Sequence, residues 1–259
     1  MAQFDNRYAQ AATAARAGVA VDEGLRAYMV SVYNYMAAGV ALTGVVAYML
    51  FSAAVTGDPA SAVARLGNGI MLTEFGRLLF VSPLRWVIML APLAFVFFLS
   101  FRVYQMSVSA AQIAFWLFAA AMGASLSTIF LVFTGASITR VFFITAAAFA
   151  SLSLWGYTTR KDLSGWGTFL FMGLIGIIIA ALVNLFLQSS ALQFAVSVMG
   201  VLVFAGLTAY DTQRIKDGYY AVVGSAEMAA KSAIMGALSL YLDFINMFTS
   251  LLYLFGERE

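Results

Sequence analysis

The sequence predicts an all-α polytopic membrane protein with seven transmembrane helices, and three observations indicate this fold class. Of the 259 residues, 63% are hydrophobic and only 10% are charged, whereas soluble domains carry about 25% charged residues. Several apolar runs are about 20 residues long, which is enough to cross about 30 Å of hydrocarbon as a helix. These runs are continuous, without the alternation of polar and apolar residues that is typical of transmembrane β-strands.

Each predicted span is one apolar run between polar breaks. The seven runs are residues 28–52, 84–102, 109–132, 138–157, 167–187, 192–210 and 232–255. They form a single transmembrane domain, residues 28–256, preceded by a polar N-terminal segment, residues 1–27. The loop 53–83 is expected to hold a short interfacial helix at "IMLTEFGRLLF" (70–80), and residues 211–231 are expected to form a long loop.

The distribution of basic residues predicts the orientation in the membrane. With seven spans, nine of the fourteen Lys and Arg residues fall on the side of the N-terminus and five on the other side. Because cytoplasmic loops carry an excess of Lys and Arg, the N-terminus is expected in the cytoplasm. Six spans followed by a re-entrant last segment is the alternative topology.

The last span carries one continuous polar stripe. Its members are small or polar residues at spacings of 4, 3, 4, 3 and 4, namely Ser232, Gly236, Ser239, Asp243, Asn246 and Ser250. Residues at this spacing lie on one face of a helix. Because polar side chains in a membrane face the bundle interior or a wet cavity, the stripe is expected to point inward. Asn246, and Asn184 on the fifth span, are interpreted either as interhelical hydrogen-bonding residues or as residues that line a site.

Two aspartates in apolar surroundings are the candidate functional groups. Asp243 lies inside the last span, and Asp211 lies at the predicted end of the sixth, followed by Arg214 and Lys216. Asp211 alone reads as a solvated helix-end residue, but antiparallel packing of the two spans would bring the carboxylates together. Two close carboxylates cannot both ionise cheaply, so such a pair would share a proton and act as a pH sensor. Arg102, at the end of the second span, is the expected cation beside them.

Missing residue types exclude several function classes. The chain contains no histidine and no cysteine, which removes the usual general base, the usual neutral-pH switch and thiolate chemistry. No phosphate-binding loop occurs, and the net charge of +2 is too small to indicate nucleic-acid binding. The sequence therefore favours a protein that is not an enzyme and has no cofactor. The oxygen ligands that remain suit Ca²⁺ or Na⁺ better than transition metals.

The two aspartate segments, "FAGLTAYDTQRIK" (204–216) and "ALSLYLDFINMF" (237–248), resemble the signature pair of the Bax inhibitor-1 family, the transmembrane Bax inhibitor motif proteins. The stretches "SPLRWVIMLAPLAF" (82–95) and "GYTTRKDLSGWG" (156–167) are similar to its bacterial branch. The resemblance covers about residues 25–255. It implies a seven-helix fold whose last helix is central, and a pH-sensitive calcium leak.

The resemblance also implies roles for single residues. Asp211 and Asp243 correspond to a bonded aspartate pair that forms the sensor and gate, and Arg102 corresponds to an arginine that joins it. The aspartates would contact Ca²⁺ only transiently. The residues expected to line the path or its polar stripe are Ser239, Asn246, Ser250 and Asn184.

Two function hypotheses follow for an integral protein of a bacterial inner membrane. The first is a pH-sensitive calcium leak channel gated by the aspartate pair, with the lipid bilayer and Ca²⁺ as its partners. The alternative is a membrane-embedded regulator without a transport role, which binds a membrane AAA protease or acts in cell-stress responses. Under the alternative, the polar segment 1–27 makes the contacts and the aspartates are structural.

Overall fold

The computed structural model describes residues 2–67 and 69–258, with side chains from residue 22 onward. Its long helices are α1 (Ala2–Ala54), α3 (Leu84–Arg102), α4 (Val108–Leu126), α5 (Gly135–Thr158), α6 (Ser164–Leu187), α7 (Ser190–Val222) and α8 (Ala226–Phe255). Two 3₁₀ turns, Val103–Gln105 and Ser127–Leu131, extend α3 and α4. Within the described residues, seven helices are long and apolar enough to span a membrane, which agrees with the predicted fold class.

The connection between the last two spans differs from the expectation. The predicted loop at 211–231 is helical over most of its length, because α7 continues to Val222 and α8 begins at Ala226. The continuation is amphipathic, with Ile215 and Tyr219 buried and Arg214 exposed, so packing stabilises it beyond the apolar run. Ser225 begins α8 as its N-cap, and its hydroxyl accepts a hydrogen bond from the Met228 N–H at 3.3 Å.

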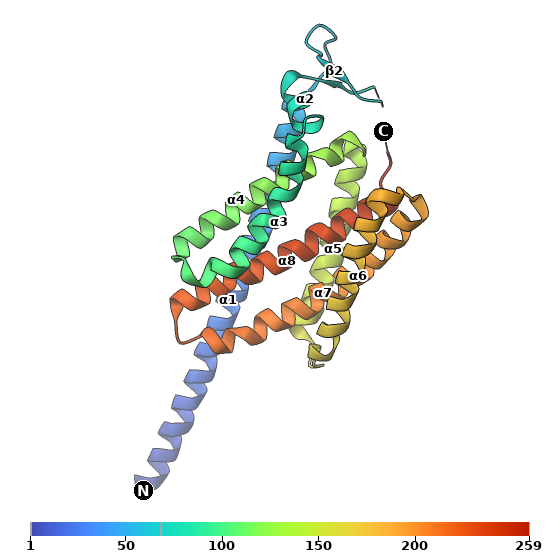
Figure 1. The fold of residues 1–259 in the computed structure, drawn as a ribbon. Coiled ribbons are helices and arrows are strands. Elements are labelled where there is room, and N and C mark those ends of the chain that lie inside the picture. Colours follow the sequence, from blue (N-terminus) through green and yellow to red (C-terminus); the bar gives the residue numbers. More distant parts are fainter. Residues whose placement is uncertain (1, 68, 259) are drawn as a thin grey trace.

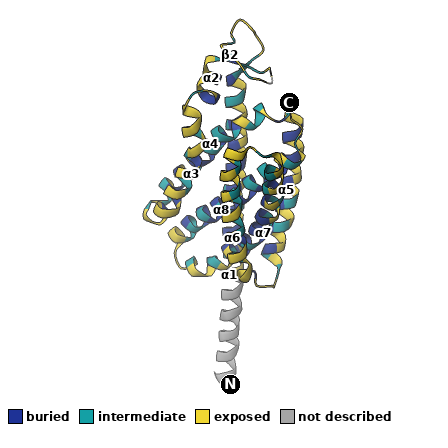
Figure 2. Ribbon diagram, turned by 45° about the vertical axis from the view of Figure 1, so that its right-hand side comes forward, coloured by how far each residue is buried: buried dark blue, intermediate teal, exposed yellow. Residues whose placement is uncertain are grey.

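Helix α8 is the central element of the bundle (Figure 1). It packs against α1, α4, α5 and α7, whereas α6 packs mainly on α7 and α3 mainly on α4. Tyr241, Phe244 and Met247 of α8 are almost fully buried, and α8 carries the darkest burial colouring in the middle of the molecule (Figure 2). The bundle therefore has an inner group of five helices and two outer helices, α3 and α6.

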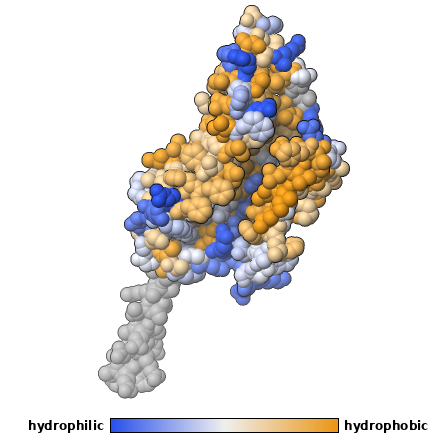
Figure 3. Space-filling model, viewed as in Figure 1, coloured by the Kyte–Doolittle hydropathy of each residue, from blue (hydrophilic) through white to orange (hydrophobic). Residues whose placement is uncertain are grey.

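The outer helices present apolar side chains to the surroundings. Phe97 and Phe101 on α3, and Phe169 and Phe186 on α6, are all more than half exposed. The surface over α6 forms one strongly hydrophobic patch (Figure 3). Such a patch would be costly in water, but it matches the hydrocarbon of a bilayer.

The segment between α1 and α3 contains a small sheet that the sequence did not indicate. Strands β1 (Val55–Thr56), β2 (Ala64–Arg65) and β3 (Met71–Leu72) pair antiparallel in the order β1-β3-β2. Two-residue strands are too short to show the alternation that identifies a strand in a sequence.

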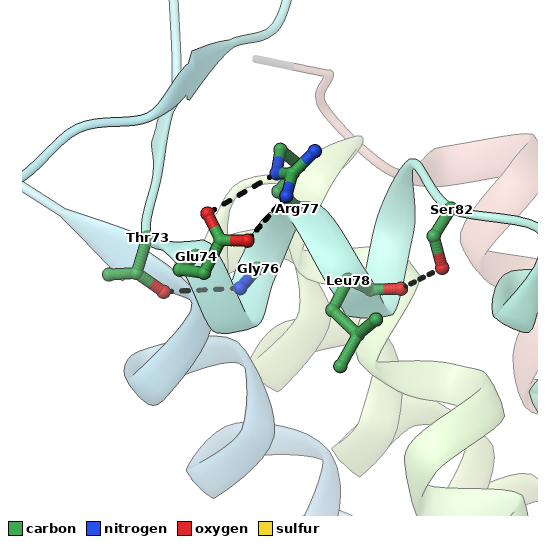
Figure 4. Close-up of polar contacts among 6 residues, drawn as sticks. All are labelled: Thr73, Glu74, Gly76, Arg77, Leu78 and Ser82. Atoms are coloured by element: carbon green, nitrogen blue, oxygen red, sulfur yellow. Dashed lines mark hydrogen bonds and ion pairs between the residues drawn. The ribbon is translucent and has the colours of Figure 1, made fainter.

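The short helix expected in this segment is present as α2 (Glu74–Phe80). Thr73 is its N-cap and accepts a hydrogen bond from the Gly76 N–H at 3.1 Å (Figure 4). Glu74 forms an ion pair with Arg77 in the same turn. At the C-terminal end, the Ser82 hydroxyl donates to the Leu78 carbonyl. Residues 70–73 were included in the expected helix but lie before it: Met71 and Leu72 form β3, and Thr73 is the cap.

Candidate functional site: a buried aspartate pair

Antiparallel packing of α7 against α8 brings the two aspartates to one cavity. Gly236 of α8 permits close approach, because a Cβ at this position would lie 3.0 Å from the Ile215 side chain of α7. Asp211 and Asp243 both line a cavity of about 500 Å³ that is bounded by α6, α7 and α8. Its other polar lining residues are Thr168, Tyr210, Arg214, Ser239 and Asn246. A polar cavity is thus built inside a bundle whose exterior is apolar.

Asp211 is held by an arginine on its own helix. Its side chain is 10% exposed, and its Oδ1 lies 3.2 Å from Nη2 of Arg214. The same Nη2 donates a weak hydrogen bond to the Ser239 hydroxyl of α8 at 3.4 Å, and the guanidinium lies 5.8 Å from the centre of the Tyr210 ring. Since 55% of the Arg214 side chain is exposed, this cation links the pair to the outer part of the cavity.

Asp243 is the more deeply buried carboxyl group. It is 4% exposed, and its Oδ2 has no hydrogen-bond partner among the described residues. Asp211 is close enough for a negative charge on one carboxylate to act on the other, although no hydrogen bond joins the two groups within the described structure. Burying a carboxylate oxygen without a hydrogen-bond partner destabilises the folded state, so the position of Asp243 is not explained by a contribution to stability.

Arg102 is not the cation beside the aspartates. It is the last residue of α3, it is exposed, and its Nη1 donates to the Gln105 side chain at 3.0 Å. Helix α3 packs mainly on α4, whereas the aspartate cavity is bounded by α6, α7 and α8. Arg214 takes the expected place because it lies one turn from Asp211 on the same helix.

The predicted lining residues divide into two groups. Ser239 and Asn246 line the cavity, and the Asn246 amide donates to the Leu242 carbonyl of its own helix at 2.8 Å. Ser250 and Asn184 lie elsewhere. The Ser250 hydroxyl donates to the Asn246 carbonyl at 2.7 Å, at a point where α8 meets a glycine of α7.

Asn184 lies in the last turn of α6, where its side chain bonds to the connection with α7. Its Oδ1 accepts a hydrogen bond from the Ser189 N–H at 2.9 Å, and its amide donates to the Gln193 side chain at 3.2 Å. Helix α6 ends three residues after it, with Gln188 in the left-handed conformation. Asn184 therefore stabilises the connection between two spans and does not line the aspartate cavity.

A chain of hydroxyl groups beside the site was missed by sequence reasoning. Tyr33 of α1 is 2.7 Å from Ser153 of α5, which is 2.9 Å from Thr212 of α7, next in sequence to Asp211. Thr212 in turn donates to the Thr208 carbonyl at 2.7 Å. Single hydroxyl residues on three separate spans give no periodic signal, so only the packing reveals their contact.

The cavity offers few side chains that could bind a metal ion. Among the described residues, no group of three or more His, Cys, Asp or Glu side chains is placed to hold a metal ion. Ca²⁺ takes six to eight oxygen ligands in a stable protein site. The two carboxyl groups and neighbouring hydroxyls of this cavity therefore fit a brief contact with a passing cation better than a permanent site.

The chain is similar to known bacterial membrane proteins over most of its length. Residues 25–259 match the family model described as "Inhibitor of apoptosis-promoting Bax1". The chain is 43% identical to an uncharacterised protein of Caulobacter vibrioides over 259 residues, which is the whole of both chains. It is 46% identical over 238 residues to the uncharacterised protein RP147 of Rickettsia prowazekii, covering 92% of each chain. It is also 44% identical over 237 residues to the inner membrane protein YbhL of Escherichia coli, covering 91% of this chain and 94% of that protein.

Proposed function

The chain belongs to the Bax inhibitor-1 family of membrane proteins, and from this premise we propose that it is a pH-sensitive calcium leak channel of the bacterial inner membrane. The observation that carries the proposal is a buried Asp243 oxygen that has no hydrogen-bond partner in the described part of the chain, in a polar cavity shared with Asp211. An ionisable residue inside a membrane is expensive and usually marks an ion or proton pathway.

The proposed pH response depends on a small set of charges. Of the residues that line the cavity, Asp211, Asp243 and Arg214 are charged and Tyr210 is the remaining titratable group; the lining residues of α6 carry no charge. With both carboxylates ionised, the set has a net charge of −1, and each proton that binds raises this charge by one. Protonation therefore changes the attraction for a cation and for Arg214, which biases the bundle between two arrangements.

Two further parts of the proposal concern placement and partners. The inner-membrane location is inferred from the Escherichia coli relative. A cytoplasmic N-terminus is inferred from the basic residues, because cytoplasmic loops carry an excess of Lys and Arg. On the same side of the membrane as the N-terminus lie the end of α3, the α5–α6 turn and the start of α8. These carry Arg102, Arg160, Lys161 and Lys231. A reporter enzyme fused after residue 259 that is active only in the periplasm tests this orientation.

Calcium flux into proteoliposomes at several pH values tests the leak. We expect the wild type to admit Ca²⁺ at a rate that changes with pH, and Asp243→Asn and Asp211→Asn to lose that dependence. Asp162→Asn is the matched control, because it neutralises an exposed carboxylate outside the cavity. Unchanged flux and an unchanged pH response in both cavity variants would rule out the proposed gate.

The regulator hypothesis predicts a different pattern. If the chain acts by binding a membrane AAA protease, deletion of residues 2–26 abolishes the protease phenotype while calcium flux persists. Residues 1–21, most of the segment on which this hypothesis depends, lie outside the side chains that the structure describes. Flux that is lost in the aspartate variants but kept in the deletion supports the leak.

A further inference from the structure

A second cavity lies on another side of the bundle, between α1 and α5. Both helices pack on α8, and the space between them forms a groove of about 640 Å³. The lining is almost entirely apolar, with Met29, Met36, Phe149 and Leu154 among its residues. Alanines on both helices, Ala37 and Ala150, leave the room that larger side chains would fill. The volume lies in the range of small-molecule and lipid pockets.

The polar atoms in the wall of this groove already bind one another. The Thr212 hydroxyl donates to the Thr208 carbonyl, so it accepts the hydrogen bond from Ser153. Ser153 has then used its only proton and accepts from Tyr33, whose hydroxyl proton is used in turn. The hydroxyl protons of Tyr33 and Ser153, in the middle of the wall, are therefore both used, so an apolar chain can lie against these two residues without leaving their donors unsatisfied.

Basic groups gather at one end of the groove. Arg26 lines this end, is exposed, and forms no ion pair with a described acidic residue. Tyr157 of α5 lines the groove as well, and it holds a second basic residue, Lys216 of α7. The Lys216 ammonium donates a hydrogen bond to the Tyr157 carbonyl at 2.9 Å and lies 5.7 Å from the centre of the Tyr157 ring. None of the residues that line the groove is acidic. The lysine ammonium has two further donors available for an anion.

The length of the groove matches one leaflet of a bilayer. From Arg26 to Ala37 the groove follows twelve residues of α1, whose eleven steps correspond to about 16 Å at 1.5 Å per step. This is about half of the 30 Å hydrocarbon thickness. A lipid whose phosphate lies at Arg26 would therefore place its acyl chain along the groove as far as the middle of the membrane.

We propose that the groove between α1 and α5 is a binding site for an anionic phospholipid, with one acyl chain between the helices and the phosphate on Arg26 and Lys216. A zwitterionic lipid could place its chains in the same groove, but it would supply no net negative charge for the two basic residues. The site uses residues other than the aspartate cavity, so it does not depend on calcium leakage.

Native mass spectrometry of the purified full chain tests the site. The protein is given equal amounts of phosphatidylglycerol and phosphatidylcholine with identical oleoyl chains. We expect the wild type to retain one phosphatidylglycerol in preference, and Arg26→Gln to lower that preference about fivefold, since each basic residue near the surface contributes about that factor. Arg102→Gln, which removes another exposed charge at the end of α3 outside the groove, is expected to leave the preference unchanged.

A second pair of variants tests the groove itself. Ala150→Phe fills it and is expected to abolish retention of the lipid, whereas Ala181→Phe on the exposed face of α6 keeps it. Unfolding temperatures from tryptophan fluorescence identify any variant that fails to fold. Equal retention of both lipids by the wild type, equal losses with Arg26→Gln and Arg102→Gln, or displacement of the lipid by free glycerol 3-phosphate would each overturn the proposal.

Discussion

Replacement of Asp243 by leucine is expected to stabilise the protein. The carboxyl group is 4% exposed, and one of its oxygens has no hydrogen-bond partner among the described residues. Leaving a buried polar atom unsatisfied costs about 1–3 kcal/mol, more when the group is charged. The leucine removes this cost and the repulsion from Asp211, and the adjacent cavity of about 500 Å³ gives it room. Arg214 keeps its ion pair with Asp211, so no cation loses its partner.

The expected gain is therefore about 1–3 kcal/mol in the free energy of unfolding. For a chain of this size, each kcal/mol raises the unfolding temperature by roughly 2–4 °C. Heating in detergent while intrinsic fluorescence is recorded measures the shift, since the chain contains four tryptophans and no cysteine for a thiol dye. Calcium flux of the same variant is measured in parallel, and we expect it to lose its pH response.

The control is Asn246→Leu, one turn along the same stripe and in the same cavity. Among the residues with described side chains, its amide bonds only to the Leu242 carbonyl of its own helix, so the variant is expected to change stability by less than about 1 kcal/mol. A lower unfolding temperature for Asp243→Leu than for the wild type would refute the reasoning. It would mean that the aspartate pair braces the bundle and that the unpartnered oxygen is not a cost.

Three further predictions concern the packing and the loops. Gly156→Leu is expected to lower the free energy of unfolding by about 1–3 kcal/mol, because a Cβ at this position meets the backbone of α7. If the variant unfolded at the wild-type temperature, this close contact would be contradicted. The Thr43 hydroxyl donates its proton to the Ala119 carbonyl, so in the 2.6 Å contact between Thr43 and Tyr241 the tyrosine is the donor. Tyr241→Phe removes this hydrogen bond, and we expect the free energy of unfolding to fall by about 1 kcal/mol. An unchanged unfolding temperature would show that the bond adds no stability. Hydrogen bonds from the Ser164 side chain and backbone hold the pKa of Asp162 below its ordinary value, so this carboxylate stabilises the fold above about pH 4 and the contribution is lost as the pH falls further. Thermal unfolding of Asp162→Asn should accordingly lose less stability between pH 5 and pH 3 than the wild type, and equal losses would argue against the hydrogen-bonded carboxylate.

The spans were predictable because a bilayer imposes a strong local rule. Every backbone group inside hydrocarbon must be satisfied within its own helix, so each crossing needs a continuous apolar run of about 20 residues. The seven runs of the sequence match seven helices. Of the polar stripe on α8, Ser239, Asp243 and Asn246 line the aspartate cavity, whereas Ser250 lies elsewhere. Residues 211–231 were predicted wrongly because the apolar run ends near Asp211 while the helix continues as an amphipathic segment to Val222.

The sequence by itself determined the membrane class, the number of spans, and the two aspartates that prove to share one cavity, since hydropathy and helical spacing are properties of single segments. Only the tertiary structure decided which groups surround those aspartates. Arg214 follows Asp211 by three residues, a spacing that pairs side chains on a helix, but this segment was expected to be a loop, so the spacing was not used. Arg214 forms the ion pair with Asp211, whereas Arg102 does not reach it, because α3 packs on α4 and the aspartate cavity is bounded by α6, α7 and α8. Side-by-side placement of helices depends on surface shape summed over the whole bundle, and this information is not contained in any one span.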